Sequence, residues 1–113
     1  MPKYSGKQMN KTISITNDFS RYPYGRYRKH SKASGEAFRE DLLIPALQEN
    51  KSVTVDLDGT EGFGSSFLDE AFANLLRLEQ FDKEFLKNNL HFKSEEDPSL
   101  IDEIMEYIDK AAD

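Results

Sequence analysis

The stretch VTVDLDGTEGFGSSFLDEAF, residues 53–72, carries the strongest fold signal in the chain. Its first six residues alternate apolar and polar side chains, a period of two that predicts a β-strand over 53–58 with one buried face. The glycine-rich residues 59–64 predict a tight turn. Beyond the turn, apolar residues recur at three- and four-residue spacings, which is the period of a helix. The stretch therefore predicts a strand, a turn and a helix that begins at Ser65 or Ser66.

Further strands and helices are predicted on both sides of this stretch. They are a strand over 12–16, a helix over 35–47 capped by Ser34, a short helix within 81–89, a strand over 90–92 and a final helix that has Asp97 as its N-cap, Pro98 as its first residue and its end near Ala112. Pro45 lies inside the first helix, where its missing N–H predicts a kink or a tightened last turn. In the second helix, Ser66 and Asp69 have the spacing of a capping box. Alternation of strands and helices predicts an α/β layer with parallel neighbouring strands.

Length and composition limit the class of protein. The chain has 113 residues and a formal net charge of -6, so we expect a flexible tail over 1–11 and a single domain over 12–113. It has no cysteine, which excludes disulfides, thiolate zinc sites and thiol nucleophiles. The longest apolar run covers only 42–47, and the N-terminus lacks the apolar core of a secretory signal. We therefore expect a cytoplasmic protein that does not enter the membrane.

The charge is unevenly distributed along the chain. Residues 1–32 hold eight Lys or Arg and one acid, a balance of +7, whereas residues 33–113 hold seven and twenty, a balance of -13. The basic part interleaves cations with aromatic residues, namely Arg21, Tyr22, Tyr24, Arg26, Tyr27, Arg28, Lys29 and Lys32. Such a mixture suits single-stranded nucleic acid, but Tyr and Arg are also enriched in protein interfaces, and the arginines could pair with the acidic body. The acidic body would repel a polyanion. We favour an interaction or anion-binding loop, with nucleic-acid binding as the alternative.

The residues in and around the turn at 59–64 disfavour three kinds of site. A dinucleotide-binding loop would continue Gly62 and Gly64 with a third glycine at position 67, where Phe67 stands. The serines lack the following glycine of a nucleophile elbow. Asp56 and Asp58 share one strand face and could hold Mg²⁺, although acids that flank a turn are the preferred explanation. We therefore expect no catalytic residue, no metal site and no cofactor, and the protein is not predicted to be an enzyme.

Residues 55–72 resemble the bacterial STAS-like domain family of unknown function, which is related to STAS domains (sulfate transporter and anti-sigma factor antagonist). Residues 34–47 and 97–108 fit the same family, so the resemblance covers roughly Ile13 to Ile108. It implies a small STAS-like α/β layer, with a mixed or parallel sheet of about 3–4 strands and helices packed mainly on one face.

The resemblance also implies a function. In STAS antagonists the first serine of the turn is phosphorylated by a histidine-kinase-like ATPase, and this serine corresponds to Ser65, with Ser66 next to it. Two residues depart from the STAS pattern: Gly64 replaces the acidic residue before the serine, and Phe67 replaces the glycine after it. The expected function is a non-catalytic regulatory protein-interaction module with an ATPase-like kinase as partner and serine phosphorylation as its switch.

Two groups of residues are the candidate sites. Ser65 and Ser66 are the candidate phosphorylation sites, because a helix start attracts phosphate; simple helix capping is their alternative role. The candidate interaction or anion-binding surface comprises Arg26, Tyr27, Arg28, Gly62, Phe63, Gly64 and Phe67. We expect Arg26 or Arg28 to approach the start of the second helix and to serve as charge partner for a phosphate or an acidic group. The sequence does not predict an oligomeric state.

Overall fold

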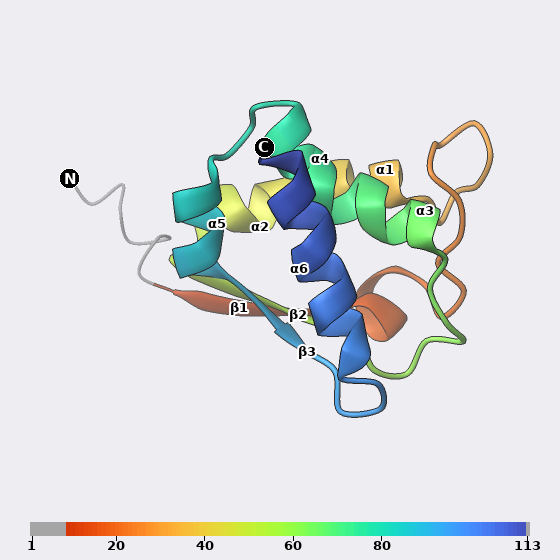
Figure 1. Ribbon diagram of the computed structural model, residues 1–113. Coiled ribbons are helices and arrows are strands. Elements are labelled where there is room, and N and C mark those ends of the chain that lie inside the picture. The colour runs from red at the N-terminus through yellow and green to blue at the C-terminus, as the bar shows by residue number, and fades with distance from the viewer. Residues whose placement is uncertain (1–8, 113) are drawn as a thin grey trace.

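Three parallel strands form the sheet, in the order β1-β2-β3 (Figure 1). The computed structural model describes residues 9–112, so residues 1–8, which make up most of the expected tail, lie outside the described residues. The strands are β1 (Asn10–Ser14), β2 (Ser52–Asp56) and β3 (Leu90–Lys93). The predicted α/β fold with a small parallel sheet is confirmed.

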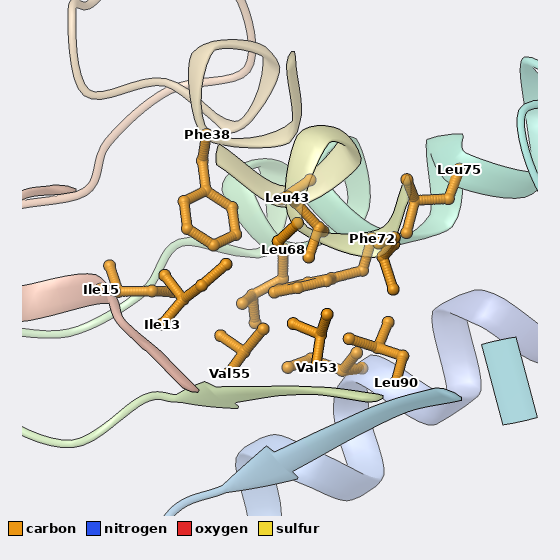
Figure 2. Close-up of a cluster of buried hydrophobic side chains, with 14 of the residues drawn as sticks. Ile13, Ile15, Phe38, Leu43, Val53, Val55, Leu68, Phe72, Leu75 and Leu90 are labelled. Carbon is orange, nitrogen blue, oxygen red and sulfur yellow. The ribbon is translucent and has the colours of Figure 1, made fainter. Parts of the chain in front are cut away.

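The two faces of the sheet differ in chemistry. Ile13, Val55 and Phe92 are in register across the three strands. Ile13 and Val55 point toward the helices in Figure 2, and the ring of Phe92 packs against Phe72 of η4 at 5.1 Å between centroids. On the opposite face the register aligns Thr12, Thr54 and His91, of which Thr12 and His91 are exposed. In Figure 1 the helices lie on one side of the sheet. The period-two pattern of the strands therefore produces a single covered face, as predicted.

Two long helices and two further helices make up this covering layer. The first long helix consists of α1 (Gly35–Phe38), η3 (Arg39–Leu43) and α2 (Ile44–Glu49), and the second of α3 (Ser65–Leu68), η4 (Asp69–Ala73) and α4 (Asn74–Arg77). The two further helices are α5 (Lys83–Asn89) and α6 (Ser99–Ala111). The η segments are π-helical turns, one in the middle of each long helix. Within residues 9–112, no helix has the length and apolar composition needed to cross a bilayer.

The expected tightening at Pro45 is wrong. The turn that precedes Pro45 is wider than an α-helical turn, because the N–H of Ile44 donates to the carbonyl of Arg39, five residues earlier. Pro45 cannot donate a hydrogen bond, and its ring crowds the carbonyl of the preceding turn. A π turn at this point moves the backbone so that the helix continues through Pro45 as α2.

The first strand lies two residues earlier than predicted. Asn10 and Lys11, expected in the tail, begin β1, and the chain leaves the strand at Ser14 instead of Thr16. The Ser14 hydroxyl accepts from the N–H of Asn17 at 3.1 Å, and the Ser14 N–H donates to Asp18 at 2.8 Å. These local bonds turn the backbone into the π-helical turn η2 (Ile15–Phe19), which the alternating pattern did not reveal.

The two long helices approach each other closely at Gly35. A Cβ atom at this position would lie 2.6 Å from the carbonyl oxygen of Phe67 and 2.9 Å from the Cβ of Glu70. Below the contact, Phe38, Phe72 and other side chains of both helices pack on the strands (Figure 2). Gly35 therefore sets the spacing of the helices that carry the candidate site.

Candidate functional site

The turn between β2 and α3 is shaped by two glycines. Gly59 has φ +92°, and a Cβ atom there would lie 2.8 Å from the hydroxyl of Thr16. Gly62 has φ +135°, a conformation that L side chains rarely adopt. Gly64, by contrast, has φ -80° and open space around it. Backbone geometry therefore accounts for Gly59 and Gly62 but not for Gly64.

Ser65 and Ser66 are exposed at the start of α3. The N-cap is Gly64, which has no side chain, and no side-chain capping bond is present there. The capping box predicted for Ser66 and Asp69 is therefore wrong, because the helix begins two residues too early for Ser66 to be its cap. Neither hydroxyl is committed to capping α3.

Tyr107 of α6 lies beside Ser65. Its hydroxyl donates to Glu103 at 2.6 Å, which raises the pKa of Tyr107 above its usual value. A contact with Ser65 acts on the same pKa in the opposite direction. The Ser65 hydroxyl therefore lies among polar groups of two helices.

Phe67 is fully buried and unavailable to a partner. Its ring packs against Phe38 at 6.1 Å and against Phe63 at 5.7 Å between centroids. The observed role of this bulky side chain is to pack the start of the helix against the core. The inclusion of Phe67 in the interaction surface is corrected accordingly, while Phe63 is half-buried above it.

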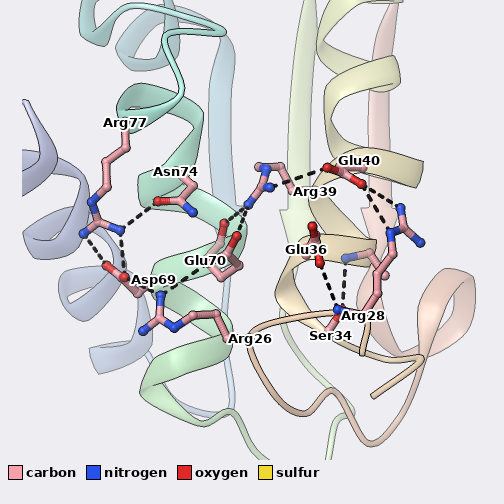
Figure 3. A network of polar contacts seen from close by, with 11 residues as sticks. Arg26, Arg28, Ser34, Glu36, Arg39, Glu40, Asp69, Glu70, Asn74 and Arg77 are labelled. Carbon is pink, nitrogen blue, oxygen red and sulfur yellow. Dashed lines mark hydrogen bonds and ion pairs between the residues drawn. The ribbon is translucent and has the colours of Figure 1, made fainter. Parts of the chain in front are cut away.

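Arg26 reaches the second long helix (Figure 3). Its Nη1 lies 2.9 Å from Oδ2 of Asp69 and 3.4 Å from Oε1 of Glu70. Arg77 approaches Asp69 from the other side, and its Nη1 and Nη2 atoms each lie 2.8 Å from an oxygen of the Asp69 carboxylate. Hydrogen bonds from Arg77 and then Arg26 hold the pKa of Asp69 below its usual value. Asp69 follows Ser65 by one helical turn, so two arginines converge next to the exposed serine.

A buried ion pair continues this network between the long helices. Nη1 of Arg39 lies 2.8 Å from Oε2 of Glu70, and both side chains are almost completely buried. Arg39 and Glu70 belong to the two π turns. Arg77, Asp69, Arg26, Glu70 and Arg39 thus form a continuous series of alternating charges, which we call the charge chain (Figure 3).

Arg28 does not join Arg26. Its guanidinium pairs with Glu40 at 2.9 Å and with Asp41 at 2.8 Å, on the outer side of η3. These bonds raise the pKa of Arg28 and lower that of Asp41. Of the two arginines proposed to approach the second helix, the structure brings Arg26 there and holds Arg28 on the first.

The basic loop, residues 20–34, is built into the domain through its backbone. The carbonyls of Gly25 and Arg26 accept hydrogen bonds from the N–H groups of Gly35 and Glu36 at 2.9 and 3.0 Å. These N–H groups at a helix start have no partner within the helix, so the loop satisfies them. The Ser34 hydroxyl accepts from the N–H of Ala37, and the predicted cap is confirmed. The loop is therefore ordered by α1 and is not a free arm.

The basic loop also touches the glycine turn. The N–H of Glu61 donates to the carbonyl of Arg21 at 2.8 Å, and the two side chains pair at 3.2 Å. Tyr22, Tyr24 and Tyr27 remain exposed along the loop, with 63%, 67% and 41% of their surface accessible. Two segments about 40 residues apart in the sequence therefore lie side by side.

Asp56 and Asp58 have structural partners. Asp58 accepts from the N–H groups of Glu95 and Glu96 at 3.1 and 3.0 Å, which lowers its pKa and ties the turn to the loop before α6. Asp56 accepts from the N–H of Asp58 at 3.0 Å. Among residues 9–112, no group of three or more His, Asp or Glu side chains is arranged to hold a metal ion. Turn and loop bonds therefore account for both carboxylates.

Sequence reasoning missed the charge chain beyond Arg26. The missed residues are Arg39, Glu70 and Arg77, together with the role of Asp69 as an acceptor. A signal existed for one of them, because Arg39 lies one turn before buried Leu43 on the apolar stripe of its helix. A charged residue in such a position needs a buried partner.

Comparison with known proteins bears on the same part of the chain. The family model of the STAS-like domain of unknown function (DUF4325) matches residues 34–100, which include Ser34, α1, β2, the glycine turn and the second long helix. No curated protein and no solved structure matches the chain. The match covers more than half of the sequence, and the fold agrees with it. The chain therefore belongs to the family of STAS-like domains of unknown function.

Proposed function

We propose that this chain is a non-catalytic regulatory module that binds a protein partner through the basic loop and the glycine turn. The observation that carries the proposal is the placement of Arg26 beside Asp69, one turn from exposed Ser65. It brings the tyrosine-bearing loop and the exposed serine into one surface. Membership of the STAS-like family supports a regulatory role of this kind.

In this proposal the partner contacts the exposed tyrosines, since aromatic residues with polar ends are favoured at interfaces. Tyr22 and Tyr24 are the most exposed large side chains of the loop. Arg26 and Arg28 are paired with acids of the domain, so the loop presents fewer free cations than its sequence suggests. This favours a protein partner over single-stranded nucleic acid, which would be held mainly by free cations.

Phosphorylation of Ser65 by an ATPase-like kinase is the proposed switch. A phosphate there would add about -1.5 to -2 charge at pH 7 and compete with Asp69 for Arg26. Because Arg26 connects the loop to α3, this competition would move the loop and change the surface that the partner contacts. Glu103 and Asp69 lie near Ser65, so an unpaired phosphate would be strongly disfavoured there.

Capture of a partner from a lysate of the source organism tests the proposal. The bait is the wild-type chain, and the comparison is the Tyr22→Ala/Tyr24→Ala double variant, with Leu78→Ala as a matched change of an exposed apolar residue outside the surface. We expect one protein to be retained by the wild type and Leu78→Ala but lost with the double variant. Identical capture by all three would contradict the proposal, whereas a nucleic acid released by salt would favour the alternative.

The switch is tested without knowing the kinase. Phosphoserine is installed at position 65 or, as a control, at 66, and the phosphate pKa is measured by ³¹P NMR. We expect the pKa at 65 to lie below the free value of about 6 and to rise in Arg26→Ala, because a guanidinium stabilises the dianion. A pKa at 65 that is raised by the neighbouring acids and unaffected by Arg26→Ala would contradict the competition.

A further inference from the structure

The outer edge of β3 is a second surface without a partner in the described part of the chain. Within residues 9–112, β3 pairs only with β2 and ends the sheet. The strand contributes two apolar side chains to the covered face, Leu90 and Phe92. An edge strand leaves alternate backbone N–H and C=O groups free to pair with another strand.

A cavity opens beside this edge. It has a volume of about 270 Å³ and lies between α5 and α6, on the helix side of β3. Its apolar lining comes from three elements: Leu86, Leu90, Phe92, Met105 and Ile108. The volume is that of roughly nine waters at about 30 Å³ each, so an apolar side chain fits inside. Phe92 is only half-buried, because nothing in residues 9–112 completes the layer over it.

The opposite edge of the sheet is built differently. On β1, Lys11 is in register with Val53 and so lies on the covered face, where it is exposed. A charge on this face of an edge strand blocks the addition of another strand. The covered face of β3 carries no charge, and an apolar cavity continues from it. Of the two edges, only β3 is suited to strand addition.

The side chains around the cavity complement one another. Met105 of α6 borders the cavity and is 39% exposed, so the same edge carries an exposed apolar side chain and an apolar cavity. On the rim, α5 contributes exposed Lys83 and Lys87, and α6 contributes exposed Asp109, which pairs with Lys83 of its own copy at 3.1 Å. A two-fold interface requires a patch that is complementary to itself. Antiparallel pairing of two β3 strands would place α5 of each copy beside α6 of the other.

We propose that two copies of this chain associate through β3, forming a continuous six-stranded sheet in which Met105 of each copy enters the cavity of the other. Two three-stranded sheets contribute to it. Lys87 of each copy lies beside Asp109 of its partner in this arrangement, so opposite charges meet on the rim. The proposal is independent of the basic loop and of Ser65.

Sedimentation equilibrium of the full chain tests the association between about 1 μM and about 1 mM, the range of weak to moderate affinities. We expect the mass to rise from 13.0 kDa toward twice that value, with slower hydrogen exchange across Leu90–Lys93 in the associated form. Met105→Lys should hold the protein monomeric, whereas Leu78→Lys, a matched change of another exposed apolar residue, should not. Circular dichroism of each variant verifies its fold.

A charge exchange identifies the arrangement. Lys87→Glu and Asp109→Lys should each weaken the association at least tenfold, and the double variant should restore it, because the exchange reverses both charges of each pair. Three results would overturn the proposal: a monomer at about 1 mM, a dimer unaffected by Met105→Lys, or a dimer that leaves β3 exchange unchanged. A monomer that instead takes up an extended peptide at β3 would also overturn it.

Discussion

Replacing Gly35 by alanine places a methyl group where the two long helices touch. The new Cβ would lie 2.6 Å from the carbonyl oxygen of Phe67, 2.9 Å from the Cβ of Glu70 and 3.1 Å from the backbone nitrogen of Ala71. Two of these three atoms belong to the backbone, so no side-chain rotation relieves the contact. The helices must separate by several tenths of an ångström at the least, which would stretch the Arg39–Glu70 pair.

The magnitude follows from two opposing contributions. Overpacking of this kind costs typically about 1–3 kcal/mol. Alanine is favoured over glycine within a helix by about 0.5–1 kcal/mol, although position 35 is the first helical residue and gains less. We therefore expect Gly35→Ala to lower the free energy of unfolding by about 1–2 kcal/mol, or about 4–16 °C in Tm for a domain near this size.

Urea unfolding of three glycine variants measures this effect. Gly64→Ala is the control, because Gly64 has negative φ and no atom within 4 Å of the added Cβ. Its stability should stay within about 1 kcal/mol of the wild type, because the loss of a favoured N-cap residue opposes the lower entropy of the unfolded chain. Gly62→Ala separates backbone strain from steric contact, since its φ is +135° but the surrounding space is open. A Gly35→Ala variant as stable as Gly64→Ala would refute the argument that close approach sets the helix spacing.

Three further predictions concern the ionised side chains. Arg39→Met should lower the free energy of unfolding by about 3–5 kcal/mol because it leaves Glu70 buried without its main partner, and Arg39→Met/Glu70→Leu should recover most of the loss, as measured by urea unfolding. The depressed pKa of Asp69 contributes stability that is present above about pH 4, the unfolded pKa, and is lost as pH falls through the folded pKa. Between about pH 5 and pH 2, the free energy of unfolding should therefore fall less steeply with decreasing pH in Asp69→Asn than in the wild type, as measured by urea unfolding at each pH. Arg28→Ala should leave the urea midpoint nearly unchanged, because its partners Glu40 and Asp41 are exposed and water screens these pairs; a large decrease would contradict this reasoning.

The order of strands and helices followed from the sequence because each element has its own period. Val53 and Val55 alternate with polar residues on a strand, and both are buried as expected. The start of the last helix was located to within one residue: Asp97 was expected as its N-cap and Pro98 as its first residue, whereas Pro98 is the N-cap and the helix covers Ser99–Ala111. The Asp97 carboxylate accepts from the N–H of Ser99 at 3.2 Å. Such signals are local, so one sequence suffices to interpret them.

The charge chain was not predictable in the same way. Arg39 and Glu70 are 31 residues apart, and Arg26 and Asp69 are 43 apart, so their pairing depends on how the helices dock. The π turns place Arg39 and Glu70 between the helices. Pro45 gives a local reason for the first of them, but no local feature of the sequence predicts the second, η4. The distribution of charge along the chain predicted attraction between its two parts without identifying the partners.

Ion pairs within the molecule neutralise much of the charge imbalance between the basic loop and the acidic body. Arg21, Arg26 and Arg28 of the basic loop each pair with an acid of the body. The exposed surface of the loop therefore presents tyrosines, with Lys29 beside Tyr27, rather than a cluster of unpaired arginines. These pairs differ in exposure: those of Arg21 and Arg28 are open to water and weaken with salt, whereas Arg26 contacts half-buried Asp69 and buried Glu70. Salt should therefore loosen the ends of the loop before its middle. Arg26 is the last contact to hold the loop on the helix that carries Ser65, which makes it the position where an added negative charge has the greatest effect.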